Sequence, residues 1–152
     1  MAARLHREAT GDSGFTLIEL LVVILIIGIL AAIAIPSFLS QKSKATDAAA
    51  KELVRTGALA AETYATDHSG TYTGLEPKVL HEYEPAIQTA PGGNNAYLSA
   101  AKDEESGNGY VVTATAATNG DTFTITRKAS GEVTRTCKAE TSNKAGCLTG
   151  SW

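Results

Sequence analysis

The stretch from Phe15 to Ile35 constrains this chain most, because it would be apolar on every side of a helix. Glu19 is its only strongly polar side chain. A helix that is hydrophobic all round belongs in a membrane or a large core, not on the surface of a small soluble domain. About 20 apolar residues are enough to span a bilayer. We therefore expect a transmembrane helix at residues 15–36, with room in the 152-residue chain for one further domain.

Glu19 is the exception within this helix. A carboxylate in the hydrocarbon core is costly, so a charge retained there is a candidate functional group whose partner has to be identified. The alternative interpretation is a signal anchor that tolerates one glutamate near its membrane end.

The residues around Glu19 form a recognisable pattern. Gly14-Phe15-Thr16-Leu17-Ile18-Glu19 follows a charged segment and precedes an apolar run that ends at Pro36. This arrangement resembles the processing site of class III signal sequences, which occur in type IV pilins and pseudopilins. The resemblance implies that residues 1–14 are a leader, that a prepilin peptidase cuts between Gly14 and Phe15, and that Phe15 is then N-methylated.

The same resemblance implies two successive surroundings for the helix, first membrane lipid and then the core of a filament of identical subunits. Cleavage before Phe15 would create a cationic α-amino group, which could meet Glu19 of a neighbouring subunit. An ion pair gains more in a low-dielectric bundle than in water, and an unpaired charge there is costly. We therefore expect a Phe15–Glu19 assembly ion pair, formed with the help of pilus or secretion machinery.

Beyond Pro36 the helical pattern continues to residue 68 but becomes amphipathic. Gly28 and Pro36 are the predicted weak points, where the helix can bend or stretch on packing into a filament. The predicted apolar stripe recurs at spacings of three, four and seven residues or their sums: Phe38, Ala45, Ala49, Leu53, Ala60 and Tyr64.

The remainder divides into two parts. Residues 69–109 are predicted to be a connecting loop region, with a short helical turn near Pro77–Tyr83. Residues 110–152 are predicted to be an antiparallel β-meander with strands at 110–115, 122–127 and 132–137, because β-branched residues alternate there between turn signals. The expected fold class is α+β, with the long helix packed on a three- to four-stranded antiparallel sheet, as in type IV pilins.

Cys137 and Cys147 lie on the side of the membrane that we expect to be outside, where a disulfide is the natural state of two cysteines. Free thiols are the alternative. We expect a single pass through the inner, cytoplasmic membrane with the N-terminus on the inside of the cell, because of the leader resemblance and the cysteines. The positive charges alone do not decide orientation, since Arg4 and Arg7 precede the apolar run while Lys42 and Lys44 follow it.

We find no pattern typical of a catalytic site. P-loop, Gly-x-Gly-x-x-Gly, His-Glu-x-x-His and Ser-His-Asp arrangements are absent from the sequence, so we expect no enzyme and no metal-dependent catalysis. Net charge is −3, which does not indicate nucleic-acid binding. No cofactor is expected, but calcium is left open. Some pseudopilins bind calcium in sheet-side loops, and residues 103–108 and Asp121 supply oxygen donors in this chain. A solvated acidic loop is the favoured interpretation.

We therefore expect a structural, major-pilin-like subunit of a type IV pilus, made in the membrane and moved into an extracellular filament. Two alternatives remain. One is a major pseudopilin of a type II secretion system, which shares the same N-terminal features. The other is a membrane-anchored extracellular binding domain that does not polymerise.

Overall fold

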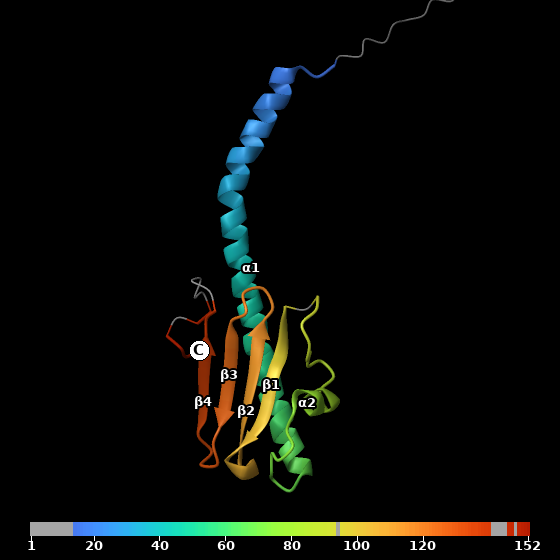
Figure 1. Cartoon of the computed structure of the whole chain (residues 1–152), viewed down its shortest axis with the longest axis vertical. Coiled ribbons are helices and arrows are strands. Elements are labelled where there is room, and N and C mark those ends of the chain that lie inside the picture. Colours follow the sequence, from blue (N-terminus) through green and yellow to red (C-terminus); the bar gives the residue numbers. More distant parts are fainter. Residues whose placement is uncertain (1–13, 94, 141–145, 148) are drawn as a thin grey trace, which may run out of the picture. The chain divides into compact units, whose positions relative to one another are not determined.

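The computed structural model describes residues 14–93, 95–140, 146–147 and 149–152. The predicted leader therefore lies outside the described residues, except for Gly14. Two compact units are present, residues 1–37 and residues 38–152, and the first helix contributes to both. In chain order the elements (Figure 1) are α1 (Leu17–Asp67), α2 (Pro77–Tyr83), β1 (Ala96–Glu104), the short 3-10 helix η1 (Glu105–Gly107), β2 (Gly109–Ala116), β3 (Thr122–Arg127) and β4 (Val133–Lys138).

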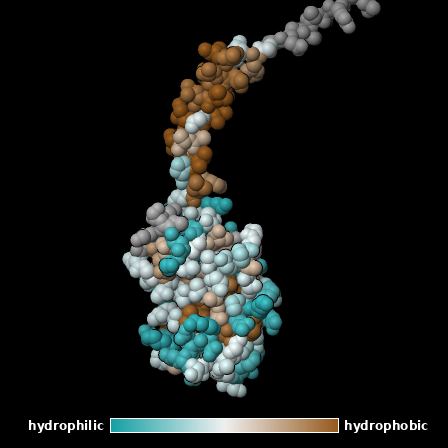
Figure 2. Space-filling model, in the orientation of Figure 1, coloured by the Kyte–Doolittle hydropathy of each residue, from teal (hydrophilic) through white to brown (hydrophobic). Residues whose placement is uncertain are grey.

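In the first unit, α1 is a continuous α-helix that contains both Gly28 and Pro36. Its large apolar side chains are exposed at every turn, as the brown helical segment in Figure 2 illustrates. Among the described residues, α1 is the one helix long and apolar enough to cross a membrane, judged by length and composition. The apolar half of the predicted long helix is thus confirmed as a helix, and no other described residue covers its apolar surface.

The second unit is built on a four-stranded antiparallel sheet with the strand order β1-β2-β3-β4. Buried and half-buried residues alternate along β2 and β3, so one face of the sheet is apolar and the other carries threonines. The second half of α1 packs on the apolar face, and α2 lies beside β1 (Figure 1). The α+β class and the three predicted strands are confirmed to within about one residue at each end.

Gly57 allows the helix to approach the sheet closely. A Cβ atom at this position would lie 2.9 Å from Cγ1 of Val112 and 3.1 Å from Cδ1 of Leu98. Both of these side chains are fully buried. A larger residue at Gly57 would therefore push the helix away from β1 and β2.

The prediction of a connecting loop region at 69–109 was wrong in one respect, because these residues include strand β1. This strand is Ala-Tyr-Leu-Ser-Ala-Ala-Lys-Asp-Glu, which has no β-branched residue and is rich in types that are depleted in strands. A register irregularity between Leu98 and Ala100 also interrupts the alternation of its side chains. Pairing with β2, and not local preference, makes this segment a strand.

The predicted apolar stripe of the second half-helix was also misplaced at its start. Phe38 is 66% exposed, and Ala45 is exposed as well. The face of α1 that is buried carries mainly small and polar residues, because close packing on the sheet favours small side chains. The buried residues are Ser43, Thr46, Asp47, Ala50, Val54, Gly57, Ala60, Ala61, Tyr64 and Ala65.

Candidate functional site

The start of α1 is a capping box formed by Thr16 and Glu19. The Thr16 backbone N–H donates to Oε2 of Glu19 at 2.9 Å, and the Thr16 hydroxyl donates to the same oxygen at 2.7 Å. In return, the Glu19 N–H donates to Oγ1 of Thr16 at 3.2 Å. Two backbone N–H groups that a helix start leaves without intrahelical partners are thereby satisfied. In the single chain, Glu19 therefore has a partner that the sequence interpretation did not identify.

Phe15 and Glu19 nevertheless belong to one surface. Together with Ile18, Val22 and Val23 they line a shallow apolar hollow on the side of α1. The Phe15 side chain is 85% exposed. The predicted ion pair joins two subunits, so the single chain does not test it, and it stays a prediction.

Gly14 lies just before the start of α1 and is exposed. A Cβ atom at Gly14 would meet no other atom within 4 Å. Packing among the described residues therefore does not require glycine at the predicted cleavage position.

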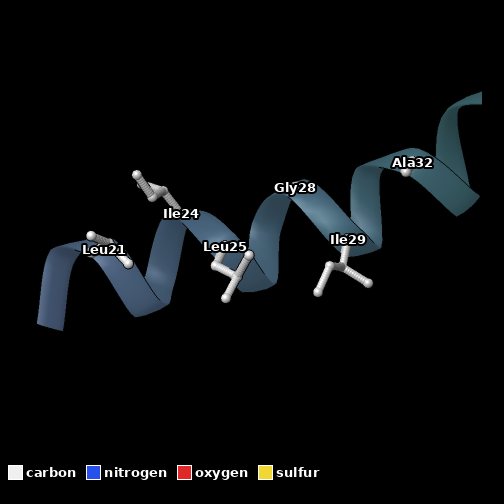
Figure 3. Close-up of a pocket in the computed structure, with 6 residues that line it drawn as sticks. All are labelled: Leu21, Ile24, Leu25, Gly28, Ile29 and Ala32. Atoms are coloured by element: carbon white, nitrogen blue, oxygen red, sulfur yellow. The ribbon is translucent and has the colours of Figure 1, made fainter. Parts of the chain in front are cut away.

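Gly28 has the same property in the middle of the apolar helix, where a Cβ atom would also meet nothing within 4 Å. Figure 3 shows that the ribbon is bare at Gly28, between the side chains of Ile24 and Ala32. Leu25 and Ile29 project from the neighbouring row of the same helix (Figure 3). The result is a shallow notch in an apolar surface of the helix.

The structure confirms the disulfide between Cys137 and Cys147, whose Cα atoms are 5.7 Å apart. It holds the C-terminal residues along the free edge of β4. The Cys137 N–H donates to the Gly150 carbonyl oxygen at 2.9 Å, and the Trp152 indole N–H donates to the Thr136 carbonyl oxygen at 2.9 Å. The tail thereby covers part of an edge strand that would otherwise be open.

The predicted calcium-donor segment at 103–108 forms the end of β1 and η1, not an open loop. Lys102 pairs with Glu104 at 2.7 Å, and the carboxylate of Glu105 accepts a hydrogen bond from the Ala129 N–H at 2.6 Å. Within the described ranges there is no group of three or more His, Cys, Asp or Glu side chains placed to hold a metal ion. Asp121, the other predicted oxygen donor, lies at the β2–β3 turn and not in this segment.

A polar cluster that the sequence analysis missed ties α1 to the sheet. Glu62 accepts from the Tyr72 hydroxyl at 2.7 Å and pairs with Arg127 at 3.1 Å. Burial, and then the adjacent Glu62 carboxylate, raise the pKa of Tyr72 to about 12. Burial also raises the pKa of Tyr110, whose ring packs edge-on against Tyr72. No motif could have revealed this cluster, since its members come from four separate segments.

Residues 10–35 match the family model described as the prokaryotic N-terminal methylation motif. The chain is 41% identical over 71 residues to "Type II secretion system core protein G" of Pseudomonas aeruginosa, a match that covers 45% of this chain and 50% of that protein. It is 50% identical over 48 residues to "Type IV major pilin protein PilA" of Myxococcus xanthus, covering 32% of this chain and 22% of that protein. No solved structure gives a significant match.

The matched region thus spans half of one curated relative and about a fifth of the other. The residues that match the family model include the Thr16–Glu19 capping box, so the methylation motif coincides with the start of α1. The chain therefore carries a prepilin-type N-terminal methylation motif on an α+β fold of the pilin kind, and it has homologues among type IV pilins and type II secretion proteins.

Proposed function

We propose that this chain is a structural subunit of a type IV pilus, cut by a prepilin peptidase between Gly14 and Phe15 and polymerised through the apolar half of α1. One observation carries the proposal: the methylation motif opens a helix whose apolar surface no other described part of the chain covers. Such a surface is stable in lipid, or against copies of itself. The proposed role is structural and not enzymatic.

Polymerisation would bury the exposed apolar side chains of α1 against equivalent helices. The notch at Gly28 would let two such helices approach closely, as small residues do between membrane helices. The new Phe15 amine would begin next to the Thr16–Glu19 capping box, close to the carboxylate that we expect a neighbouring subunit to use. The machinery that extracts subunits from the membrane would consist of other proteins.

A second candidate is a major pseudopilin of a type II secretion system, which the similarity to the Pseudomonas aeruginosa core protein G favours. Filament length and the effect of gene loss on secreted proteins would distinguish it from a pilus subunit. A membrane-anchored binding domain that never polymerises is a third hypothesis, and it predicts an uncut N-terminus.

The test compares the wild type with Gly14→Val in the native cell. Filaments are sheared from the surface, and the N-terminal peptide is identified by mass spectrometry. We expect wild-type subunits to begin at N-methylated Phe15 and the Gly14→Val chain to stay uncut in the membrane, because a β-branched side chain should not fit a site shaped for glycine.

Gly92→Val is the matched control, since a Cβ atom at that exposed glycine would also meet nothing within 4 Å. It should be processed and assembled normally. Wild-type filaments that retain Met1 would overturn the cleavage proposal. A wild-type chain that is cut but never found in filaments would overturn the structural role.

A further inference from the structure

In the described part of the second unit, the exposed large hydrophobic side chains lie at two places. Phe38 and Leu39 are near the start of the unit, where they are 66% and 54% exposed. Leu59, further along the same helix, is 70% exposed, and Val133 of β4 is 50% exposed. Exposed apolar groups with polar residues around them mark interaction surfaces. These two places are therefore candidate points of contact.

Leu59 and Val133 border one hollow between α1 and the sheet, which has a volume of about 380 Å³. Ile125 of β3, which is buried, supplies another part of its apolar lining. A large hydrophobic side chain from outside could therefore be buried in this hollow, where it would lose its contact with water.

The two ends of the hollow differ in charge. Arg55 lies one turn before Leu59 on α1, and Arg135 of β4 lines the hollow as well. Glu62 lies one turn after Leu59; its side chain is 45% exposed, and it pairs with Arg127 at 3.1 Å. A carboxylate has about four acceptor sites, so Glu62 can accept a further donor. One end of the hollow is thus cationic, and the other presents a carboxylate.

Phe38 is followed one turn later by Lys42, on the same face of the helix. Lys42 is exposed and forms no ion pair within 4 Å in the part of the chain that the structure describes. We propose that the hollow beside Leu59 receives Phe38 of a second copy of this chain, with Lys42 of that copy next to Glu62. This contact rests on the proposed function, because it requires copies of the chain to assemble.

The charges determine the direction and the stagger of the second helix. If the two helices are parallel, Lys42 lies towards Glu62; if they are antiparallel, it lies towards Arg55, where like charges repel. Phe38 and Leu59 are 21 positions apart. At a rise of 1.5 Å per residue, the two copies are then staggered by about 31 Å along α1. A pair without stagger would instead bring the Lys42 side chains of both copies together.

The contact is heterologous, because one copy offers Phe38 and the other offers the hollow. Each copy keeps its own hollow and its own Phe38 for further neighbours. Contacts of this kind extend into open helical filaments when the rotation between copies does not close a ring. Apolar burial alone is non-directional, so the combination of Phe38 and Lys42 would select one stagger among many.

The experiment is disulfide cross-linking of the full chain in assembled filaments. In Phe38→Cys/Leu59→Cys the two new cysteines lie about 31 Å apart within one helix, which is too far for an internal disulfide. After oxidation we therefore expect a ladder of covalent oligomers from sheared filaments. Lys42→Cys/Thr63→Cys has the same separation of 21 positions and leaves Phe38 in place, so it should give the same ladder.

Two matched controls test the register. Phe38→Cys/Glu52→Cys and Phe38→Cys/Thr66→Cys place the second cysteine at an exposed position seven residues before or after Leu59, on the same face of the helix. Each is about 10 Å out of register, so little ladder is expected. The native cysteines are joined to each other, and mass spectrometry of the linked peptides would identify each new bridge.

Filament yield relative to the membrane pool provides a second measurement. Phe38→Ala should lower this yield by about tenfold, because the burial of the ring is lost. Lys42→Glu should lower it as well, because it would bring a second carboxylate next to Glu62. Lys44→Glu is the matched control: it makes the same change of charge on another side of the helix and should keep the yield.

The proposed contact is overturned if filaments assemble but neither 21-position pair gives a ladder, or if the bridges form best at Glu52 or Thr66. A normal yield from Lys42→Glu would also overturn it. These outcomes leave the structural role of the chain standing, since the filaments would still be present. A wild-type chain that forms no filaments would overturn the structural role itself and this contact with it.

Discussion

Reducing the Cys137–Cys147 disulfide should destabilise the second unit and release the C-terminal tail from β4. The two cysteines are 10 residues apart. Loop-closure entropy for a loop of that length corresponds to about 2.7 kcal/mol at 25 °C. For a unit of this size, a loss of that magnitude lowers the melting temperature by about 10 °C.

The assay is thermal unfolding of the full chain in detergent with and without reductant, combined with amide hydrogen exchange. The Cys137 N–H should lose protection in reductant, because its acceptor is the Gly150 carbonyl oxygen of the tail. Amides that join β2 to β3 should stay protected, since this pairing does not involve the tail. The double variant Cys137→Ser/Cys147→Ser should behave like the reduced wild type and should not respond to reductant.

Reduction should also expose the edge of β4, where Ser151 forms a bridge with Thr136 in the oxidised chain. An unpaired edge strand is a site of association between chains. We therefore expect the reduced chain to aggregate at concentrations at which the oxidised chain does not. If the melting temperature falls by less than about 2 °C and the tail keeps its protection, the loop-entropy reasoning is wrong.

Two further predictions concern the remaining polar groups. Glu19→Ala should insert normally but yield few or no filaments. Glu19→Gln should do the same although it can keep the capping box, whereas Thr16→Val should retain most assembly. The measurement is the yield of sheared filaments relative to the subunit left in the membrane, and a normal yield from Glu19→Gln would refute the ion pair. Because the pKa of Tyr72 is raised to about 12, its stabilising contribution should be present below pH 10 and be lost as pH rises towards 12. The free energy of unfolding, measured by denaturant titration at pH 8 and pH 11, should fall less between these two pH values in Tyr72→Phe than in the wild type. Tyr110 should account for the loss of stability that remains. A loss of stability equal to that of the wild type would reject the assignment of the effect to Tyr72.

Patterns close together in the sequence predicted much of this protein. The apolar run, its single carboxylate and the Gly14–Phe15 junction are contiguous, so a local motif was enough to identify the start of α1. Alternation in β2 and β3 likewise located the strands, because β-branched residues with period two suit a sheet with one buried face. Thr16 was missed, although the spacing of Thr16 and Glu19 is that of a capping box.

What the sequence by itself determined is thus the order and type of most elements, since propensity and periodicity act over a few residues. Tertiary structure decided the rest. Strand β1 exists because β2 pairs with it, and the face of α1 that is buried was set by close approach at Gly57 and not by the most apolar stripe. Asp47 and Asp121 are 74 positions apart, and only the packing of α1 against the β2–β3 turn brings their carboxylates into one buried junction.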